Sequence, residues 1–213
     1  GLGLSEERLS KILGNRRHEV VIATKGGLSW KKSPSVRSVV IKDSSPAAIR
    51  RDVESSLSRL RLESLPIFFV HWPDNNTPIE DTFIELLKIQ NEGKIKSIGC
   101  SNFSAQQLSA ACSISQVDYL QLPINILNGE LDSEVSDICT KNKIKVIAYN
   151  ILENGLLTGK LDKNSNFPEN DRRSRLPLFK GIEFINALSR VEELKVKAVE
   201  NNSNLLQYSI NWV

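Results

Sequence analysis

The sequence predicts an α/β protein built on a parallel sheet, and three observations lead to this fold class. Short apolar runs recur along the chain without polar–apolar alternation, which is the pattern of strands buried on both faces. Segments with apolar residues at helical spacing separate these runs, and strands that alternate with helices form βαβ units. With 213 residues, 40% of them hydrophobic, the chain can bury the core of one domain.

The expected strands lie at regular intervals. They are residues 20–25, 67–72, 95–101, 119–122 and 145–150. The run from Ile67 to Val70 leads directly into His71, Trp72 and Pro73. Because proline cannot donate a hydrogen bond to a sheet ladder, we expect that strand to end there.

Several helices between these strands have recognisable starts. Ser45 followed by Pro46 combines an N-cap with a proline in the first helical position. Capping boxes are predicted at Thr77–Glu80 and at Ser104 with Gln107. Residues 131–139 have the apolar spacing of a further helix.

Three stretches complete the assignment. Residues 28–44 and 153–182 are expected to be long polar loops. Residues 183–213 are predicted to be mostly helical, with a break at Ser203.

This order of elements favours a (β/α)8 TIM barrel that is present as a fragment, because a complete barrel takes roughly 250 residues. An open, flavodoxin-like sheet of five strands is the alternative, but it leaves the terminal helices and the second long loop unexplained. No G-x-G-x-x-G turn follows a strand, so a Rossmann dinucleotide site has no support. The chain contains no methionine, not even an initiator, so we expect either a trimmed piece of a longer protein or a sequence in which methionines were replaced.

Composition excludes several classes of function. The net charge of +3 is too small to indicate nucleic-acid binding, although it suits an anionic cofactor. Cys100, Cys112 and Cys139 are odd in number and have no metal-like spacing, so we expect a reduced, cytoplasmic setting without a disulfide framework or a metal site. No stretch is long enough to insert into a membrane.

Two strand ends carry side chains capable of chemistry. His71 and Lys25 each follow a buried apolar run, and parallel α/β folds keep their reactive residues at the carboxyl ends of strands. The simpler interpretations are a structural histidine bonded to a neighbouring strand and a lysine that ends its strand in solvent.

The motifs along the chain resemble those of the aldo-keto reductase superfamily, and the resemblance covers essentially all of it. Each motif is weak alone, but their order and spacing are specific. They are Gly3-Leu4-Ser5-Glu6, Val20 to Lys25, His71-Trp72-Pro73-Asp74, Gly93-Lys94-Ile95, Gly99-Cys100-Ser101-Asn102-Phe103, Gln121 with Pro123 and Asn125, Ala148-Tyr149, and Gly155-Leu156-Leu157-Thr158-Gly159-Lys160. The last stretch and the loop 167–173 are most similar to the bacterial general-stress and channel-β-subunit-like branches.

The resemblance implies a single barrel domain over residues 1–213, truncated at both ends, that reduces an aldehyde or ketone with NADPH. Lys25 and His71 match the lysine and histidine of the family's catalytic tetrad. The tetrad's aspartate and its proton-donating tyrosine would precede Gly1. Two strands in front and an eighth strand behind are also expected outside these residues.

The tetrad's residue types suit carbonyl reduction. A free phenol has a pKa of about 10, and a lysine ammonium beside it favours phenolate and lowers that value. A histidine can donate a hydrogen bond to the carbonyl oxygen, as a neutral or a charged imidazole. By resemblance, these roles belong to Lys25 and His71.

The resemblance also assigns cofactor and substrate positions. Ser101, Asn102 and Gln121 match residues that bind the nicotinamide carboxamide, and Tyr149 matches the aromatic residue that stacks on the nicotinamide ring. Residues expected along the diphosphate are Asn150, Leu152, Gly155, Leu156, Thr158, Gly159 and Lys160. Asn150-Ile151-Leu152 replaces the commoner Ser-Pro-Leu, so backbone amides are expected to contribute there. Trp30 and Trp72 are expected to wall the substrate pocket, with ordinary packing as the alternative; for Gln121 the alternative is an interior amide satisfied by its neighbours.

Two other functions stay open at this point. One is a regulatory subunit that binds NADP(H) with little turnover, and the other is an unrelated barrel enzyme that uses Lys25 as a Schiff-base nucleophile. An oligomeric partner is open as well. The reductase interpretation predicts that Lys25, His71, Asn102, Gln121 and Tyr149 converge on one cavity.

Overall fold

The computed structural model describes residues 3–31 and 39–213, and the chain forms two compact units. Unit 1 comprises Gly1–Leu122 and Asp132–Ile147. Unit 2 comprises Pro123–Leu131 and Ala148–Val213. The single domain expected over residues 1–213 stays a prediction.

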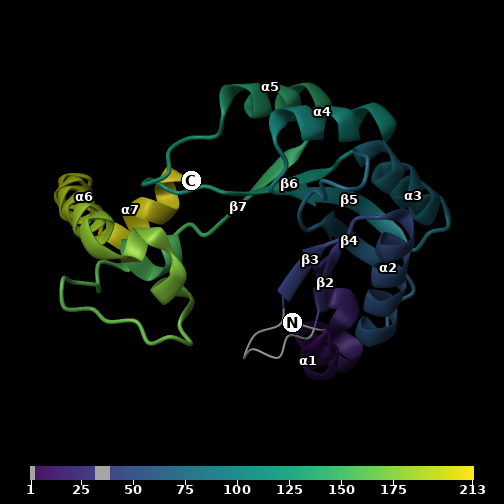
Figure 1. Cartoon of the computed structure of the whole chain (residues 1–213), viewed down its shortest axis with the longest axis horizontal. Coiled ribbons are helices and arrows are strands. Elements are labelled where there is room, and N and C mark those ends of the chain that lie inside the picture. The colour runs from purple at the N-terminus through teal and green to yellow at the C-terminus, as the bar shows by residue number, and fades with distance from the viewer. Residues whose placement is uncertain (1–2, 32–38) are drawn as a thin grey trace. The chain divides into compact units, whose positions relative to one another are not determined.

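A five-stranded sheet organises the fold, in the order β1-β4-β5-β6-β7 (Figure 1). Its strands are β1 (Ala23–Gly26), β4 (Leu65–Val70), β5 (Ile95–Ser101), β6 (Tyr119–Pro123) and β7 (Lys145–Tyr149). The pairs β1–β4, β4–β5 and β5–β6 are parallel, and the sheet is not closed. All five expected strands are therefore present. β4 ends at Val70, so His71 lies just beyond the strand.

Helices cover one face of the sheet in unit 1. They are α2 (Pro46–Leu60), α3 (Ile79–Asn91), α4 (Ala105–Ile114) and α5 (Ser133–Asn142), and α1 (Leu4–Leu13) packs against α2. Each helix contacts the next one along the chain, so all four lie on the same side of the sheet (Figure 1). This is the arrangement of a barrel wall, with the helices outside.

The predicted helix starts are confirmed at two positions and wrong at one. The Ser45 hydroxyl accepts a hydrogen bond from the Ala48 N–H at the start of α2. Ser104 and Gln107 form both bonds of a capping box at α4. Thr77 does not cap α3, because its hydroxyl donates to the Asp74 carboxylate at 2.8 Å instead.

Strand register places one row of residues on the inner face, which we define as the sheet face away from α2–α5. Lys25 is paired with Phe69, Phe69 with Gly99, and Gly99 with Tyr119. A Cβ at Gly99 would lie 2.5 Å from the Phe69 ring, so only glycine fits there. The Phe69 and Tyr119 rings meet across this gap with their centroids 6.4 Å apart.

The opposite, helical side of the sheet holds three free thiols. Cys100 on β5 is fully buried, Cys139 on α5 is buried and Cys112 on α4 is half buried. Burial raises the pKa of each thiol, and raises that of Cys100 most. Within the described residues, no three His, Cys, Asp or Glu side chains are grouped as metal ligands.

A hairpin replaces part of the polar loop expected over residues 28–44. Strands β2 (Leu28–Lys31) and β3 (Val39–Lys42) pair antiparallel, so the loop prediction is wrong for both strands. Every residue of β3 is exposed, and a strand without a buried face lacks the pattern that reveals strands in a sequence. Residues 32–38 lie outside the described residues.

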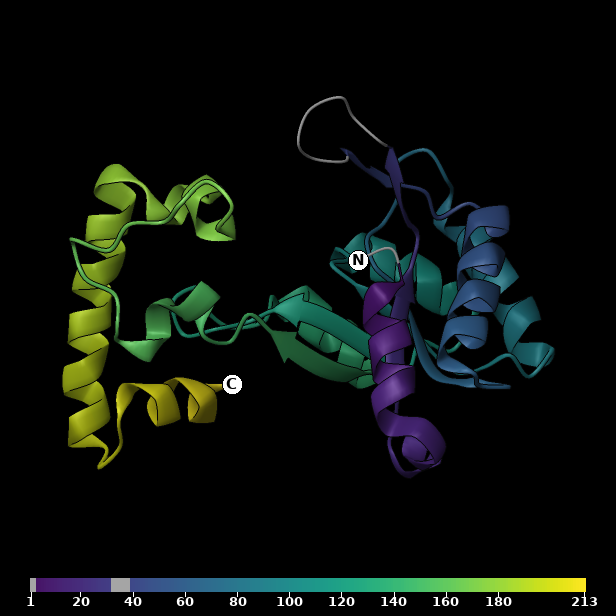
Figure 2. The same ribbon diagram turned by 90° about the horizontal axis from the view of Figure 1, so that it is seen from below.

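Unit 2 has its own core, formed with helices α6 (Gly181–Glu200) and α7 (Leu205–Trp212). The predicted break at Ser203 is confirmed, since it lies between these helices. The polar loop expected over residues 153–182 instead contains three 3-10 helices: η2 (Glu153–Thr158), η3 (Arg172–Arg175) and η4 (Pro177–Phe179) (Figure 2). Leu156, Leu157 and Phe179 from this segment are buried against α6. Tertiary packing thus orders a stretch whose composition is typical of a loop.

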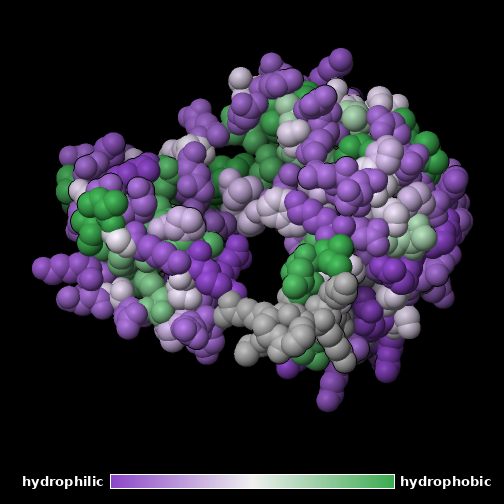
Figure 3. All heavy atoms as spheres, in the orientation of Figure 1, coloured by the Kyte–Doolittle hydropathy of each residue, from purple (hydrophilic) through white to green (hydrophobic). Residues whose placement is uncertain are grey.

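The surface shown in Figure 3 is mainly hydrophilic, with apolar patches over β3 and α6. Val39 and Val40 on β3 are exposed, as are Ile182 and Val199 on α6. Among the helices within residues 3–31 and 39–213, none has the length and hydrophobicity needed to cross a bilayer.

Candidate active site

A cavity of about 700 Å³ in unit 1 contains both predicted catalytic residues. It is lined by residues of β1, β2, α1 and α2, with His71 from the segment after β4. The side chains of Lys25 and His71 are each half buried. A half-buried lysine and a half-buried histidine therefore share one solvent-accessible space.

The backbone brings these residues together. The His71 N–H donates to the Gly26 carbonyl at 2.9 Å, which joins the end of β4 to the end of β1 beside Lys25. Lys25 Nζ lies 5.5 Å from the centroid of the Phe69 ring on the inner face. Both residues thus belong to the carboxyl edge of the sheet.

Asn102 links the next two strands to the same edge. Its side-chain amide donates to the His71 carbonyl at 3.1 Å and to the Ser101 hydroxyl at 3.0 Å. Its backbone N–H donates to the Gln121 carbonyl at 3.0 Å. Asn102 adopts a left-handed conformation (φ 64°), which asparagine tolerates better than most residues. His71, Ser101, Asn102 and Gln121 therefore form one continuous arrangement.

Burial and charge determine the ionisation of the cavity's basic residues. Burial lowers the pKa of the Lys25 ammonium. Burial also lowers the pKa of His71, and the nearby Lys25 charge lowers it further. Both effects favour the neutral imidazole, which carries a single ring N–H donor.

Glu6 is one of two carboxylates that line the cavity, the other being Asp52, and the partners of Glu6 keep it ionised. Burial acts to raise its pKa, but hydrogen bonds from Thr24, Ser56 and Arg59 lower it overall. The Thr24 hydroxyl and the Arg59 Nε each donate to one of its oxygens. Glu6 is thus committed to an ion pair and is poorly suited to act as a general acid.

The two tryptophans expected to wall the substrate pocket, Trp30 and Trp72, lie in different surroundings. Trp30 on β2 lines the cavity with Lys25 and His71. Trp72 is as exposed as Trp30, at 37% each, but it is not among the residues that line this cavity, and Lys42 Nζ lies 4.7 Å from the centroid of its ring. Trp30 is therefore the better placed of the two for a substrate bound in this cavity.

The remaining predicted residues belong to unit 2. Tyr149 ends β7 and is half buried, and its carbonyl accepts the Ile124 N–H at 3.2 Å. The Asn150 side chain is engaged at both ends, since its amide N–H donates to Glu153 and its Oδ1 accepts the Asn154 N–H. The Asn150 side chain therefore stabilises its own loop.

In the segment from Leu152 to Lys160, several side chains are directed into the core of unit 2. Leu156 is fully buried in the core of unit 2, and Leu152 packs against that core. Gly155 and Gly159 have φ angles of 95° and 70°, which favour glycine. Thr158 donates to the Gly155 carbonyl at 2.6 Å, and Lys160 is exposed. Any ligand of Leu152 or Leu156 would contact their peptide groups.

Sequence reasoning assigned no role to two charged residues of unit 2. Glu153 is buried and accepts four side-chain hydrogen bonds. Arg173 is held by Asp171, lies 4.5 Å above the Phe167 ring, and places Nη1 3.7 Å from where a Cβ would be at Gly155. The loop 167–173 was a motif of the resemblance, but no spacing in the sequence relates Arg173 to Gly155.

A partly closed parallel sheet with outer helices and polar residues at its carboxyl edge defines a barrel-type α/β protein. The chain belongs to the aldo/keto reductase family, whose sequence profile matches residues 1–213. The predicted superfamily is therefore confirmed.

Individual relatives agree with this assignment. Aldo-keto reductase YhdN of Bacillus subtilis is 32% identical over 100% of this chain and 64% of its own length. The NADH-specific methylglyoxal reductase of Escherichia coli is 34% identical over 70% of this chain and 48% of its own length. The glycerol dehydrogenase AKR11B4 of Gluconobacter oxydans superimposes with a TM-score of 0.89 and 34% identity, covering 99% of this chain and 64% of that one. The chain thus spans between about half and two thirds of the length of these relatives.

Proposed function

We propose that the whole protein reduces an aldehyde or ketone to an alcohol by hydride transfer from NADPH, with Lys25 and His71 at the reacting carbonyl. The observation that carries this proposal is the cavity of about 700 Å³ that Lys25 and His71 share. Asn102 ties that cavity to Ser101 and Gln121.

The donor set fits a nicotinamide cofactor. A carboxamide needs both donors and acceptors, and Ser101 and Gln121 supply a hydroxyl and a primary amide. Both amide N–H groups of Asn102 are engaged by His71 and Ser101, so Asn102 would not act as a side-chain donor. Tyr149 would stack on the ring, and the backbone of Gly155–Lys160 would hold the diphosphate, with the Lys160 charge nearby. When bound, the cofactor supplies the hydride. The E. coli relative is named NADH-specific, so the choice between NADPH and NADH belongs in the test.

His71 has a defined role in this proposal. As a neutral imidazole it donates its single N–H to the substrate carbonyl oxygen. That bond orients the carbonyl and stabilises the negative charge that develops on the oxygen during reduction. Because His71 donates only a hydrogen bond, another group must supply the proton that the carbonyl oxygen takes up.

Lys25 acts on that proton donor. We propose that the donor is a tyrosine outside residues 1–213 and that the Lys25 ammonium lowers the pKa of its phenol. Lys25 is partly desolvated, as its lowered pKa indicates. Its charge therefore interacts more strongly with a neighbouring phenol than it would in bulk water. The same burial suits a Schiff-base nucleophile, which is the specific reason to keep that second function under test.

Lys25→Met tests the electrostatic role in the whole protein. The substitution removes the charge and keeps most of the stem, so the phenol pKa should return toward about 10, at about 1.4 kcal/mol per unit. We expect NADPH-dependent reduction to fall by at least about a hundredfold, which is typical for loss of an acid–base contribution. Titration should show NADPH binding nearly unchanged. Lys96→Met, an exposed lysine of β5, is the matched control.

Borohydride trapping with a carbonyl substrate, in the absence of NADPH, separates the two chemistries. A stable adduct on Lys25 would replace the reductase mechanism with Schiff-base chemistry. Absence of an adduct, together with the loss of turnover in Lys25→Met, supports the reductase. A wild-type protein that binds NADPH but reduces no aldehyde or ketone would instead support the regulatory subunit.

A further inference from the structure

Glu153 is a buried carboxylate held entirely by side-chain amides. It is 6% exposed and lies in the segment that follows β7. Its Oε1 accepts hydrogen bonds from Asn150 at 2.9 Å and Asn154 at 3.0 Å. Its Oε2 accepts from Asn125 at 2.8 Å and Asn128 at 2.9 Å. We call these five residues the Glu153 cluster.

The two carboxylate oxygens serve different segments of unit 2. Oε1 binds the loop that contains Glu153 itself, whereas Oε2 binds the segment after β6. The Asn125 amide also donates to the Asn150 carbonyl at 3.2 Å, which adds a second link between the two segments. Glu153 therefore fastens the segment after β7 to the one after β6.

The surrounding hydrogen bonds determine how two of the amides are oriented. Asn125 Oδ1 accepts the N–H groups of Leu127 and Asn128, each at 3.0 Å. Asn150 Oδ1 accepts the Asn154 N–H at 2.9 Å. With their oxygens engaged, these amides must turn their NH2 groups toward Glu153. The cluster thus presents donors and is made for a carboxylate.

The backbone of this segment depends on those bonds. Asn150, Glu153 and Asn154 all have left-handed conformations, with φ angles of 55°, 43° and 52°. Asparagine tolerates this region, but glutamate seldom adopts it. The unfavourable conformation of Glu153 is retained because its side chain is fully bonded.

Within the part of the chain that the structure describes, no lysine or arginine pairs with Glu153. The charge is stabilised only by neutral donors inside unit 2, where salt screens interactions weakly. Removing the carboxylate charge therefore weakens bonds that nothing else replaces.

We propose that Glu153 is a positioning residue that holds residues 150–160 ready for the cofactor diphosphate before the cofactor binds. This inference rests on the proposed function, which assigns the diphosphate to this segment. Ordering the segment during folding spares the entropy that binding would otherwise have to overcome. Loss of Glu153 should thus weaken cofactor binding and leave the chemical step intact.

Glu153→Gln in the whole protein is the test. Glutamine keeps the size of the side chain, but its NH2 group would face two of the amide donors. We expect the Kd and KM for NADPH to rise about tenfold, equivalent to about 1.4 kcal/mol. The single-turnover rate of hydride transfer at saturating NADPH should stay within about twofold of wild type, because the interaction lost is one of binding. Asn164→Ala, an exposed asparagine with no bond to the cluster, should change neither value.

Hydrogen exchange of the cofactor-free protein gives a second measurement that does not require NADPH. Faster exchange of residues 150–160 in Glu153→Gln is expected, because the segment loses its anchor. If Glu153→Gln does not fold, Asn128→Ala removes one donor from an exposed position and should give about a threefold rise in Kd, in proportion to the single bond lost.

The outcomes distinguish this inference from the proposed function. An unchanged Kd in a variant whose wild type binds NADPH would overturn the inference, as would a slowed hydride transfer with unchanged Kd. A wild-type protein that does not bind NADPH or NADH, but loses protection of residues 150–160 in Glu153→Gln, would overturn the proposed function and leave the anchor as a structural element.

Discussion

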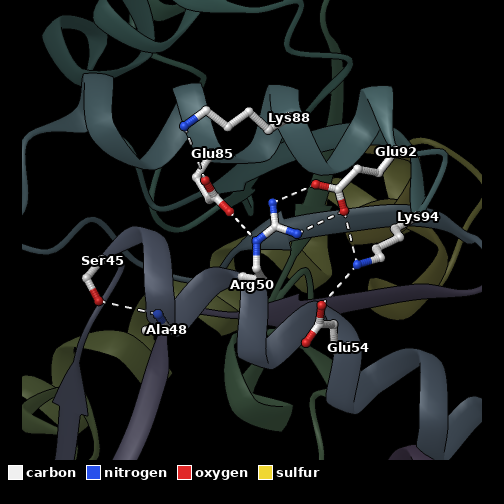
Figure 4. A network of polar contacts seen from close by, with 8 residues as sticks. All are labelled: Ser45, Ala48, Arg50, Glu54, Glu85, Lys88, Glu92 and Lys94. Carbon is white, nitrogen blue, oxygen red and sulfur yellow. Dashed lines mark hydrogen bonds and ion pairs between the residues drawn. The ribbon is translucent and has the colours of Figure 1, made fainter.

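Two networks built on carboxylates stabilise the molecule in opposite ways. In unit 1, α2, α3 and the turn before β5 are joined at the surface by a network of charged residues, shown in Figure 4. This Arg50 network consists of Arg50, Glu54, Glu85, Lys88, Glu92 and Lys94. In the Glu153 cluster of unit 2, the single charge is buried and all its partners are neutral.

The two networks differ in the partners that remain when one charged group is removed. Arg50 binds Glu85 and both oxygens of Glu92, and Lys94 binds Glu92 and Glu54, so removal of one member leaves alternative partners. Every member except Glu85, which is 8% exposed, also has access to water. Four amides surround Glu153, and at 6% exposure it has little water to replace them. The Arg50 network therefore keeps other ion pairs when one member is removed, whereas every bond of the Glu153 cluster that holds the carboxylate is lost with Glu153.

The largest expected loss in the free energy of unfolding is that of Glu153→Ala. Truncation leaves buried amide donors without an acceptor and removes the support for the left-handed backbone, at a cost of about 3 kcal/mol. Hydrogen exchange should show lost protection in residues 123–131 and 148–160, with unit 1 unchanged. Denaturation at 0.1 and 1 M salt should give the same loss, because the bonds lost are screened weakly.

Arg50→Met should have a smaller effect. We expect the free energy of unfolding to fall by about 1 kcal/mol, since the pair with Glu92 is partly exposed and such pairs contribute 0–1 kcal/mol. Glu85 is 8% exposed, but it keeps Lys88 as a partner at 3.8 Å. Guanidinium adds salt, so urea denaturation of wild type and variant is the suitable measurement. The difference should shrink at 1 M salt. A loss that matches Glu153→Ala, or one insensitive to salt, would show that the two networks do not differ as described.

The smallest expected change in the free energy of unfolding is that of Glu92→Gln, and it depends on pH. Hydrogen bonds from Arg50 and Lys94 lower the pKa of Glu92 from 4.5 to about 2. Because the folded-state pKa is the lower one, the stabilising contribution of Glu92 is present above pH 4.5 and is lost as the pH falls toward 2. Urea denaturation of wild type and Glu92→Gln should therefore differ at pH 7 and converge as pH 2 is approached. A difference that persists unchanged at that pH would contradict the assigned cause.

The sheet could be predicted from the sequence because buried parallel strands leave an unmistakable pattern. Ile67–Val70 is apolar without alternation and lies in β4. Of the run ending at Lys25, only Ala23–Lys25 lies in β1, and Val20 and Val21 before it are exposed. The polar ends of the strands could then be placed at one edge of the sheet. There the His71 N–H bonds to the Gly26 carbonyl and the Asn102 N–H to the Gln121 carbonyl, two contacts that no sequence pattern indicated. That Tyr149 shares their cavity stays a prediction.

The rest depended on contacts between distant residues. β3 was missed because neither of its faces is buried, and the residues of η2 were assigned to a loop because Leu156 and Leu157 become buried only against α6. The Glu153 cluster combines asparagines from two segments about 25 residues apart. Asparagine and glutamate are typical of exposed turns, so nothing in their order indicates a buried carboxylate.

The three thiols on the helical side of the sheet have a consequence for measuring motion. Cys112 is half buried, Cys139 is 5% exposed and Cys100 is 0% exposed, and the raised pKa of each keeps thiolate scarce. An alkylating reagent can therefore reach Cys100 only when the helical layer transiently separates from β5. The order in which the three sulfur atoms are modified, and the rate of each modification, would report how often and how far unit 1 opens without any added label.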